Sequence, residues 1–289
     1  MALLSGTFGI EETWLRKGMK EVSSNPAIFA RNNRLLAQKE LGMGNKQIDA
    51  LKDWLAAANL LSMGEKRGLL KPSTVGEVIV KYDSTFSENG TFWLIHYFLS
   101  QNTDRLWFYY WYVNEFDADI FSRNDLEAGL SNYKATSEKI IKDFCLLPLL
   151  QTMRKTRLGK SFGIMMEESP NQFRRIEPPE DKLDPMIVSY ITADWAKRND
   201  RSSANLVELV SLKGSPGKIL HLSPRRYSEY LDKIQSMFNK EVLWVSYTAG
   251  LNSVVFEQKV NPLDLLKAYY IKIRDEINPL DAHYRAMEE

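Results

Sequence analysis

The sequence is poor in the residues and motifs that build covalent or metal centres. Cys145 is the only cysteine among 289 residues, and the three histidines, His96, His221 and His283, lie far apart. One cysteine excludes an intrachain disulfide and a Cys-rich zinc site, and isolated histidines favour structural roles over metal ligation. The chain also lacks a Gly-rich dinucleotide fingerprint, an HExxH or CxxC motif and the Ser/His/Asp order of a hydrolase. We therefore expect a non-enzymatic protein with no metal and no cofactor.

Long apolar runs are missing too, since polar residues interrupt each one well short of the ~20 residues that a membrane helix requires. The first residues, MALLSGTFGIEETW, have no basic stretch and turn acidic, unlike a secretory signal. The composition, 44% hydrophobic and 26% charged, is ordinary for a globular chain. These features predict a cytoplasmic protein with no membrane partner.

Neither sign of charge is in large excess, because the net charge is +1. The distribution is uneven, however. Residues 1–82 hold 12 Lys and Arg against 8 Asp and Glu, residues 83–150 hold 5 against 10, and residues 151–289 hold 21 against 19. We therefore expect any nucleic-acid contact in the N-terminal part or in the last half, and not in the acidic middle.

Residues 32–72 contain a helical pattern, a glycine turn, a second helical pattern and a basic segment. The first pattern stops at Gly42-Met43-Gly44, and the second starts at Asn45 with apolar residues recurring on one face. This layout predicts a winged helix-turn-helix over residues 1–82, a module that usually touches nucleic acid. Ser73 or Thr74 is expected to cap the helix that follows.

The start of the second helix is expected to reach base edges, because Asn and Gln can pair with adenine and Lys with guanine or a phosphate. The basic segment would hold the DNA backbone. The predicted DNA-binding residues are Asn45, Lys46, Gln47, Lys52, Lys66, Arg67 and Lys71. Asp49 and Asp53 reduce the positive charge of this face, which leaves open a winged helix that serves protein contacts only.

The rest of the chain divides into three predicted parts. Residues 83–150 contain two aromatic-rich helical stretches and are predicted to be a helical domain with an aromatic core. Residues 151–182 are rich in Gly, Pro and charge and are predicted to be a loop or linker. Residues 183–289 are predicted to be a smaller α+β domain in which VLWVSYTAG and LNSVVFEQ form a hairpin. The predicted fold class is thus mainly α, and no internal repeat is visible.

A basic stretch in the predicted linker offers further phosphate contacts. Its Gly159-Lys160-Ser161 suggests a phosphate-binding loop, but the position six before Lys160 is Arg154 and not the required glycine. We expect an exposed segment that touches a nucleic-acid backbone or stays solvated, with the cations Arg154, Lys155, Arg157 and Lys160. Acidic clusters at 115–125 and 177–184 leave a metal-dependent nuclease as an alternative, because such enzymes need converging carboxylates.

Four motifs carry a resemblance to a known family. They are Phe8 with Glu12-Thr13 and Trp14-Leu15-Arg16-Lys17-Gly18, then Leu41-Gly42-Met43-Gly44-Asn45-Lys46, then Gly90-Thr91 with His96-Tyr97 and Asn114-Glu115-Phe116, and finally Thr248-Ala249-Gly250-Leu251. In these residues the chain resembles the bacterial family called domain of unknown function 4007, although Asn45-Lys46 stands in the inverse of the family's order.

The resemblance implies the genetic context in which the protein acts, but not an activity. Genes of this family lie near those for a cysteine desulfurase and a sulfotransfer enzyme, which suggests DNA phosphorothioation and antiviral defence or restriction-modification. The leading hypothesis is a non-enzymatic accessory component that binds double-stranded DNA and has those proteins as partners. A transcriptional regulator of its own operon, acting as a homodimer, and an interaction scaffold stay open as alternatives.

Overall fold

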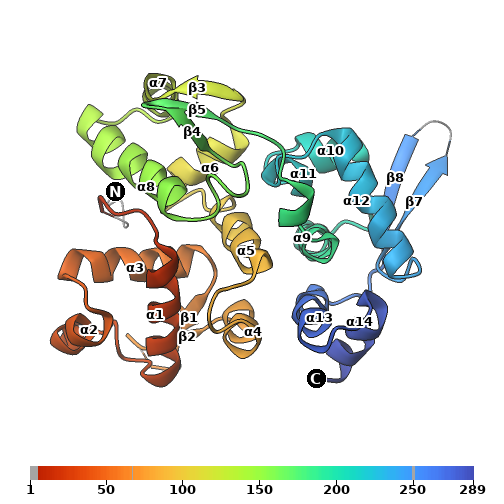
Figure 1. The fold of residues 1–289 in the computed structure, drawn as a ribbon, viewed down its shortest axis with the longest axis horizontal. Helices are drawn as coiled ribbons and strands as arrows, with labels where there is room; N and C mark the ends of the chain where they lie inside the picture. The colour runs from red at the N-terminus through yellow and green to blue at the C-terminus, as the bar shows by residue number, and fades with distance from the viewer. Residues whose placement is uncertain (1–5, 67, 249–250) are drawn as a thin grey trace. The chain divides into compact units, whose positions relative to one another are not determined.

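The computed structural model describes residues 6–66, 68–248 and 251–289. This part of the chain is mainly helical and carries three small antiparallel sheets (Figure 1), which confirms the predicted fold class at that level. It divides into two compact units: unit 1 ends at Ile176, and unit 2 spans Glu177–Glu289. Among the described residues, no helix combines the length and the apolar character that crossing a membrane demands.

The described part of unit 1 begins with three α-helices, a β-hairpin and a fourth α-helix, coloured from red through orange in Figure 1. The elements are α1 (Glu12–Ser24), the 3-10 turn η1 (Arg31–Asn33), α2 (Arg34–Leu41), α3 (Asn45–Ala57), β1 (Leu61–Met63), β2 (Leu70–Pro72) and α4 (Thr74–Tyr82). The two strands pair antiparallel, with Ser62 opposite Lys71. Ser73 caps α4, since its hydroxyl accepts the Gly76 N–H at 2.9 Å, as predicted.

The aromatic stretch forms the buried core of unit 1. It folds into α5 (Asn89–Leu99) and α6 (Trp107–Asn114). Trp93 stacks on Phe162 with ring centroids 4.5 Å apart, and His96 shares a 2.8 Å hydrogen bond with the Tyr109 hydroxyl. All four side chains are fully buried. They therefore fill the interior and are not presented to a ligand as a stacking platform.

The second sheet of unit 1 has one strand that precedes α8 in the chain and two strands that follow it. The elements are β3 (Ile120–Ser122), α7 (Arg123–Tyr133), the π-helical turn η2 (Ile140–Leu146), α8 (Leu147–Lys155), β4 (Met166–Ser169) and β5 (Gln172–Arg174), with strand order β3-β5-β4. Residues 151–182, expected to be a loop or linker, hold the end of α8, two strands and the 3-10 turn η3 (Glu180–Lys182). Strands of three or four residues are too short to show a period in the sequence.

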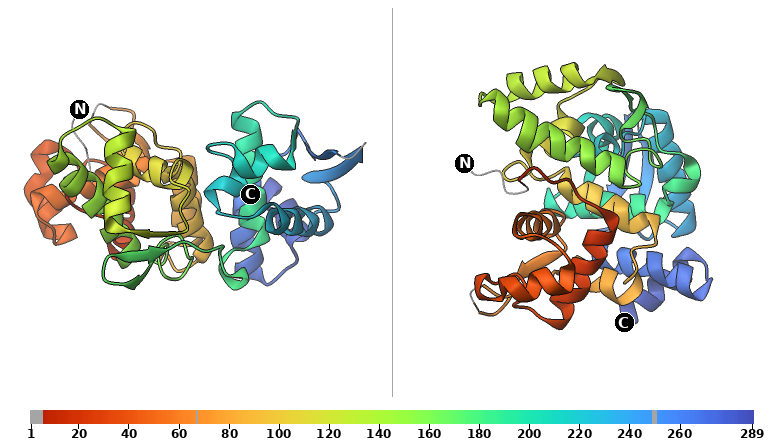
Figure 2. Two further views of the ribbon diagram at one scale, coloured as in Figure 1. Left: turned by 90° about the horizontal axis from the view of Figure 1, so that it is seen from above. Right: turned by 60° about the vertical axis from the view of Figure 1, so that its left-hand side comes forward.

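Unit 2 combines helices with a three-stranded sheet among its described residues. The elements are α9 (Pro185–Arg198), β6 (Ser203–Asn205), α10 (Leu206–Ser211), α11 (Pro216–Ile219), α12 (Pro224–Met237), β7 (Leu243–Thr248), β8 (Leu251–Phe256), α13 (Pro262–Asp275) and α14 (Pro279–Glu288). The strands run in the order β6-β8-β7, with Val245 opposite Val254. The β7–β8 pair is the hairpin that the alternating apolar residues predicted. Helices α13 and α14 lie side by side (Figures 1 and 2).

The same order of elements occurs in both units. In unit 1, α6 is followed by β3, α7, α8 and the β4–β5 hairpin; in unit 2, α9 is followed by β6, α10 and α11, α12 and the β7–β8 hairpin. In both sheets the first strand pairs with the last strand of the hairpin. The segment from α1 to β2 has this order without the first strand. The chain thus repeats one topology that no sequence period reveals.

Candidate nucleic-acid interface

Two glycines set the turn between α2 and α3. Gly42 ends α2 in the left-handed region with a φ of 67°, and its N–H donates to the Gln38 carbonyl at 2.9 Å. Other residues are strained in that conformation, so glycine is the residue that ends the helix there. Gly44 is the N-cap of α3, and Met43 between the glycines is buried. The helix boundaries predicted at this turn are confirmed.

Helix α3 docks through most of its surface and leaves a narrow exposed strip at its start. Leu51 and Trp54 are fully buried, and the Trp54 indole N–H donates to the Phe8 carbonyl at 2.9 Å. Asn45 and Lys46, by contrast, are exposed. The first-turn backbone N–H groups add partial positive charge beside them. We call Asn45 and Lys46 the α3 strip.

Two other predicted contacts on α3 are less available. The Gln47 side-chain oxygen accepts the Gly44 N–H at 2.9 Å and so binds the N-cap residue of its own helix. Lys52 is half-buried. Asp49, which was expected to weaken the positive face, is bound by Arg34 of α2 at 2.6 Å. No sequence pattern signals this pair, because it depends on how the two helices cross.

Asp53 is the unusual acid of this helix. It is only 6% exposed, and burial raises the pKa of its carboxyl to about 6, although Lys52 and Arg105 nearby pull the pKa down. Near neutral pH, Asp53 therefore carries a poorly solvated negative charge on the same helix as the α3 strip.

The β1–β2 hairpin brings two of its three predicted cations to the surface. Lys66 in the connection and Lys71 on β2 are exposed, and Arg67 lies outside the described residues. Within the described ranges, Lys46, Lys66 and Lys71 form no ion pair. Their charge is therefore available to a polyanion, and the release of its counterions would favour binding.

The cations predicted within residues 151–182 are largely held by ion pairs within unit 1. Arg154 donates two hydrogen bonds to the Glu167 carboxylate, at 2.7 and 2.6 Å. Lys155 pairs with Glu11 of the segment ahead of α1. Only Lys160 of this set is exposed without an ion pair in the described part of the chain.

Arg157 is the most tightly held of these four cations. It binds the Glu12 carboxylate at 3.0 Å and donates to the Ser87 carbonyl at 2.7 Å. Its guanidinium lies over the Phe92 ring at 4.2 Å. A guanidinium with this many partners ties distant parts of unit 1 together, and it would lose those bonds by turning to a phosphate.

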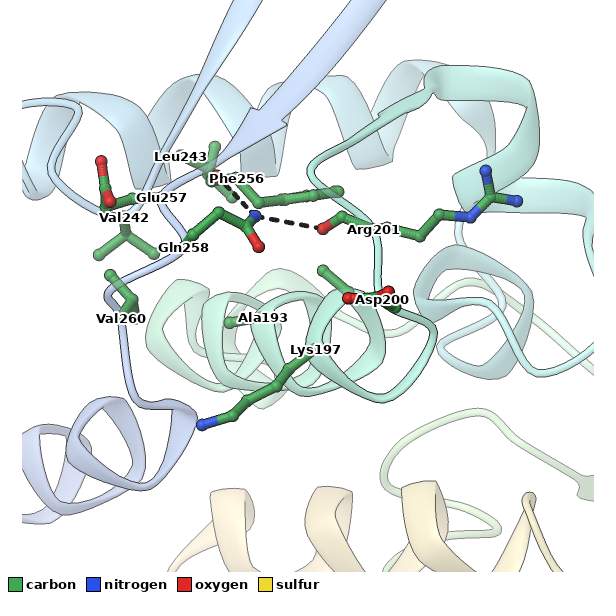
Figure 3. A pocket seen from close by; sticks show the side chains of 11 residues that line it. Ala193, Lys197, Asp200, Arg201, Val242, Leu243, Phe256, Glu257, Gln258 and Val260 are labelled. Atoms are coloured by element: carbon green, nitrogen blue, oxygen red, sulfur yellow. Dashed lines mark hydrogen bonds between the residues drawn. The ribbon is translucent and has the colours of Figure 1, made fainter.

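Unit 2 contains a pocket of about 240 Å³ where α9 ends near the strands. Its lining includes the apolar residues Leu243 and Phe256 and the charged residues Lys197 and Asp200 (Figure 3). The Gln258 amide donates to the carbonyls of Arg201 and Phe256, at 3.3 and 3.1 Å. The volume is below the roughly 300 Å³ at which ligand pockets usually begin. The pocket can therefore admit one side chain or ring, but not a large cofactor.

Metal ligation finds no support among the described residues, where no group of three or more His, Cys, Asp or Glu side chains could hold an ion. Cys145 is buried, and its burial raises the pKa of the thiol to about 12, so it is an inert apolar residue.

Comparison with known proteins gives a family and a fold. A family model described as "Protein of unknown function (DUF4007)" matches residues 5–148 and 158–270. Two solved structures, "Magnesium ion-bound SspB crystal structure" and "SspB crystal structure", are similar with TM-scores of 0.78 and 0.77. They are 18% and 19% identical, and each comparison covers 100% of this chain and 97% of that chain. No curated protein is significantly similar to the sequence.

Proposed function

Since this chain belongs to the DUF4007 family, we propose that it is a non-enzymatic accessory protein of a phosphorothioation-linked defence or DNA-modification system. Its task is to bind double-stranded DNA and to bring partner enzymes of the same operon, a sulfotransfer enzyme and a cysteine desulfurase, to their substrate. The family resemblance supports that setting, and the surface chemistry of the first three helices supports the DNA contact. The protein works in the cytoplasm, where such DNA lies.

One observation carries the DNA contact. The α3 strip is exposed, and Lys46, Lys66 and Lys71 have no ion-pair partner among the described residues. The order of α1, α2, α3 and the β1–β2 hairpin supports the proposed winged helix-turn-helix. In this proposal Asn45 and Lys46 meet base edges in the major groove, while Lys66 and Lys71 contact the phosphate backbone.

Ion pairs within the protein determine which cations are available to bind DNA phosphates. Arg154, Lys155 and Arg157 would have to leave intramolecular carboxylates before they could bind a phosphate. Their contribution to DNA affinity is therefore smaller than that of the three lysines, and Lys160 is the remaining candidate of that segment.

A salt-dependent binding assay tests the proposal. Full-length protein should bind a duplex in a gel-shift experiment at ~50 mM salt, where phosphate contacts are strongest. Substituting Lys46, Lys66 and Lys71 by Ala should weaken binding by about 15-fold for each phosphate that is no longer neutralised, because a slope of about 0.9 per phosphate corresponds to that factor at this salt concentration.

The matched control removes the same charge elsewhere, through Lys20→Ala, Lys139→Ala and Lys259→Ala, three exposed lysines outside the proposed interface. If the control triple weakens binding as much as the test triple, the interaction is diffuse and the proposed interface is wrong. If the wild type binds no duplex at low salt, the proposed function fails altogether.

A metal-dependent nuclease is the second candidate, and one comparison favours it. One of the two similar solved structures is that of a magnesium-ion-bound SspB. The test is the nicking of supercoiled plasmid in the presence of Mg²⁺, with EDTA as the control. Nicking that EDTA abolishes would replace the accessory role by catalysis.

A transcriptional regulator would use the same surface differently. It predicts a homodimer that binds one preferred operator, because two-fold symmetric proteins read two half-sites about one helical turn apart. Light scattering and a footprint on the promoter of its own operon distinguish it, since an accessory protein needs neither a dimer nor a preferred sequence.

A further inference from the structure

We propose that unit 2 carries a second duplex-DNA-binding surface, formed by the turn that leads from α10 through α11 into α12. The inference rests on the proposed function for its ligand class, double-stranded DNA, but it depends on different residues. We call residues 209–228 the basic turn.

Unit 2 has the element order of a winged helix. Its α9, β6, α10 with α11, α12 and the β7–β8 hairpin follow one another, and the sheet order is β6-β8-β7. The first strand therefore pairs with the last strand of the hairpin, as it does in such modules. By this correspondence α12 takes the position that α3 has in unit 1. In winged helices that helix is the one that enters the major groove.

Helix α12 is docked through one face only. Tyr227 and Ile234 on that face are fully buried, and the Tyr227 hydroxyl shares a 2.7 Å hydrogen bond with Thr192 of α9. The Gln235 side chain accepts the Val245 N–H at 3.1 Å and joins α12 to β7. One face of α12 is thus packed against the protein, and the opposite face is exposed. Arg225 is an exposed residue in the first turn of the helix.

Within its own sequence the basic turn carries charge of one sign, while the Glu177 carboxylate accepts the Ser223 N–H and Arg226 is paired with Glu180 and Glu229. Lys213 and Arg225 are therefore the cations on which the proposed contact depends. Between Glu208 and Glu229 the sequence has no Asp or Glu, but it has the cations Lys213, Lys218, Arg225 and Arg226. The Arg225 side chain is 91% exposed, and it pairs with Glu229, at 3.2 Å and one helical turn away. Solvent screens an exposed pair of this kind, so it contributes little to stability. A phosphate can therefore replace the carboxylate at little cost.

The distribution of charge along unit 2 restricts the proposed DNA-binding surface to the basic turn. Further along α12, Lys233 is paired with Glu180, and Asp232 is exposed. Residues 242–256 of the hairpin contain no charged residue at all. The cations therefore gather at the start of α12, the end from which such a helix contacts DNA, and the complementary partner is a polyanion.

The middle copy of the topology provides a contrast. Its equivalent helix, α8, is covered by the segment that precedes α1: the Gly9 N–H donates to Gln151 at 2.8 Å and the Ile10 N–H to Thr152 at 3.0 Å. A Cβ on Gly9 would lie 2.6 Å from the Pro148 carbonyl oxygen, so the approach is close. The first and third copies thus expose their helix starts, and the second does not.

The experiment uses the full chain with the double variant Lys213→Ala, Arg225→Ala. Both side chains are exposed, so the fold should survive, and thermal melting checks that it does. Affinity for a 30-base-pair duplex (about three helical turns) is measured by fluorescence anisotropy between ~50 and ~200 mM salt. The matched control is Lys240→Ala, Lys259→Ala, which removes two exposed lysines elsewhere in unit 2.

If both residues contact phosphates, the slope of log K against log salt should become shallower by about 2, and affinity at ~50 mM salt should fall by about 200-fold. The control pair should change the slope by less than half of that. Reversing charge with Arg225→Glu should weaken binding further than Arg225→Ala.

Three outcomes separate the two proposed surfaces. Binding by the wild type that disappears in the Lys46, Lys66 and Lys71 variant but is unchanged in the double variant would overturn this inference and leave the proposed function standing. A wild type that binds no DNA would overturn both. A double variant that keeps its DNA affinity but loses a protein of the same operon in a pull-down would overturn the inference by showing that the basic turn is a protein surface.

Discussion

Substitution of Asp53 tests whether its buried carboxylate destabilises the folded protein at neutral pH. The folded pKa of about 6 lies above the ordinary value of 3.8 because the carboxyl is buried. Folding therefore favours the protonated form. Its stabilising contribution is complete below pH 3.8 and is lost as the pH rises through about 6, so the ionised side chain weakens the fold at neutral pH.

The magnitude follows from the shift. A change from 3.8 to about 6 corresponds to about 3 kcal/mol at roughly 1.36 kcal/mol per pKa unit. Solvent and the nearby cations Lys52 and Arg105 screen part of this energy. We therefore expect Asp53→Asn to raise the free energy of unfolding by about 1–2 kcal/mol at pH 7.5, and to leave it nearly unchanged at pH 4.

Urea denaturation followed by tryptophan fluorescence measures the effect, because Trp54 lies buried on the same helix. Asp49→Asn is the matched control. Asp49 is half-exposed and paired with Arg34, so its replacement should lower stability by no more than about 1 kcal/mol. If Asp53→Asn is less stable than the wild type at pH 7.5, the carboxylate is stabilising and its burial does not have the assigned effect.

Two further predictions concern stability. Gly76→Ala should destabilise unit 1 by about 3 kcal/mol or more in urea denaturation, because its Cβ would lie 2.2 Å from the Leu60 carbonyl oxygen; Gly64→Ala, whose nearest neighbour would be at 3.0 Å, should cost far less, and equal effects would contradict this explanation. Burial lowers the pKa of His283 below 6.5, so the stabilisation by its neutral form is present above pH 6.5 and is lost as the pH falls through the lowered pKa. Thermal melting between pH 7.5 and 5 should show this loss in the wild type and less of it in His283→Leu, and an unchanged slope in the variant would refute the assignment.

Local signals in the sequence predicted the boundaries of helices well. Gly42 ended α2, Asn45 began α3 and Ser73 capped α4, because glycine conformation and capping hydrogen bonds involve residues at most four apart. The β7–β8 hairpin was found for the same reason, since its arms alternate in hydrophobicity on either side of a short turn.

The availability of the candidate site residues could not be predicted in this way. Lys46 and Arg154 look alike as basic residues in a polar context. The structure leaves Lys46 exposed at the start of α3 and binds Arg154 to Glu167. Gln47 likewise looked free to read a base, but its oxygen caps its own helix. Which polar group meets which depends on geometry that composition does not contain.

By itself, the sequence determined the helix boundaries at Gly42, Asn45 and Ser73, the β7–β8 hairpin, and that no disulfide can form within the chain. Those properties follow from short-range sterics, capping and residue counts. Only the tertiary structure decided that α8 is covered by the segment before α1, more than 140 residues away, and that one topology recurs along the chain. The reason is physical: strand order and helix docking are set by contacts between residues distant in sequence, and many different side chains can make the same contacts.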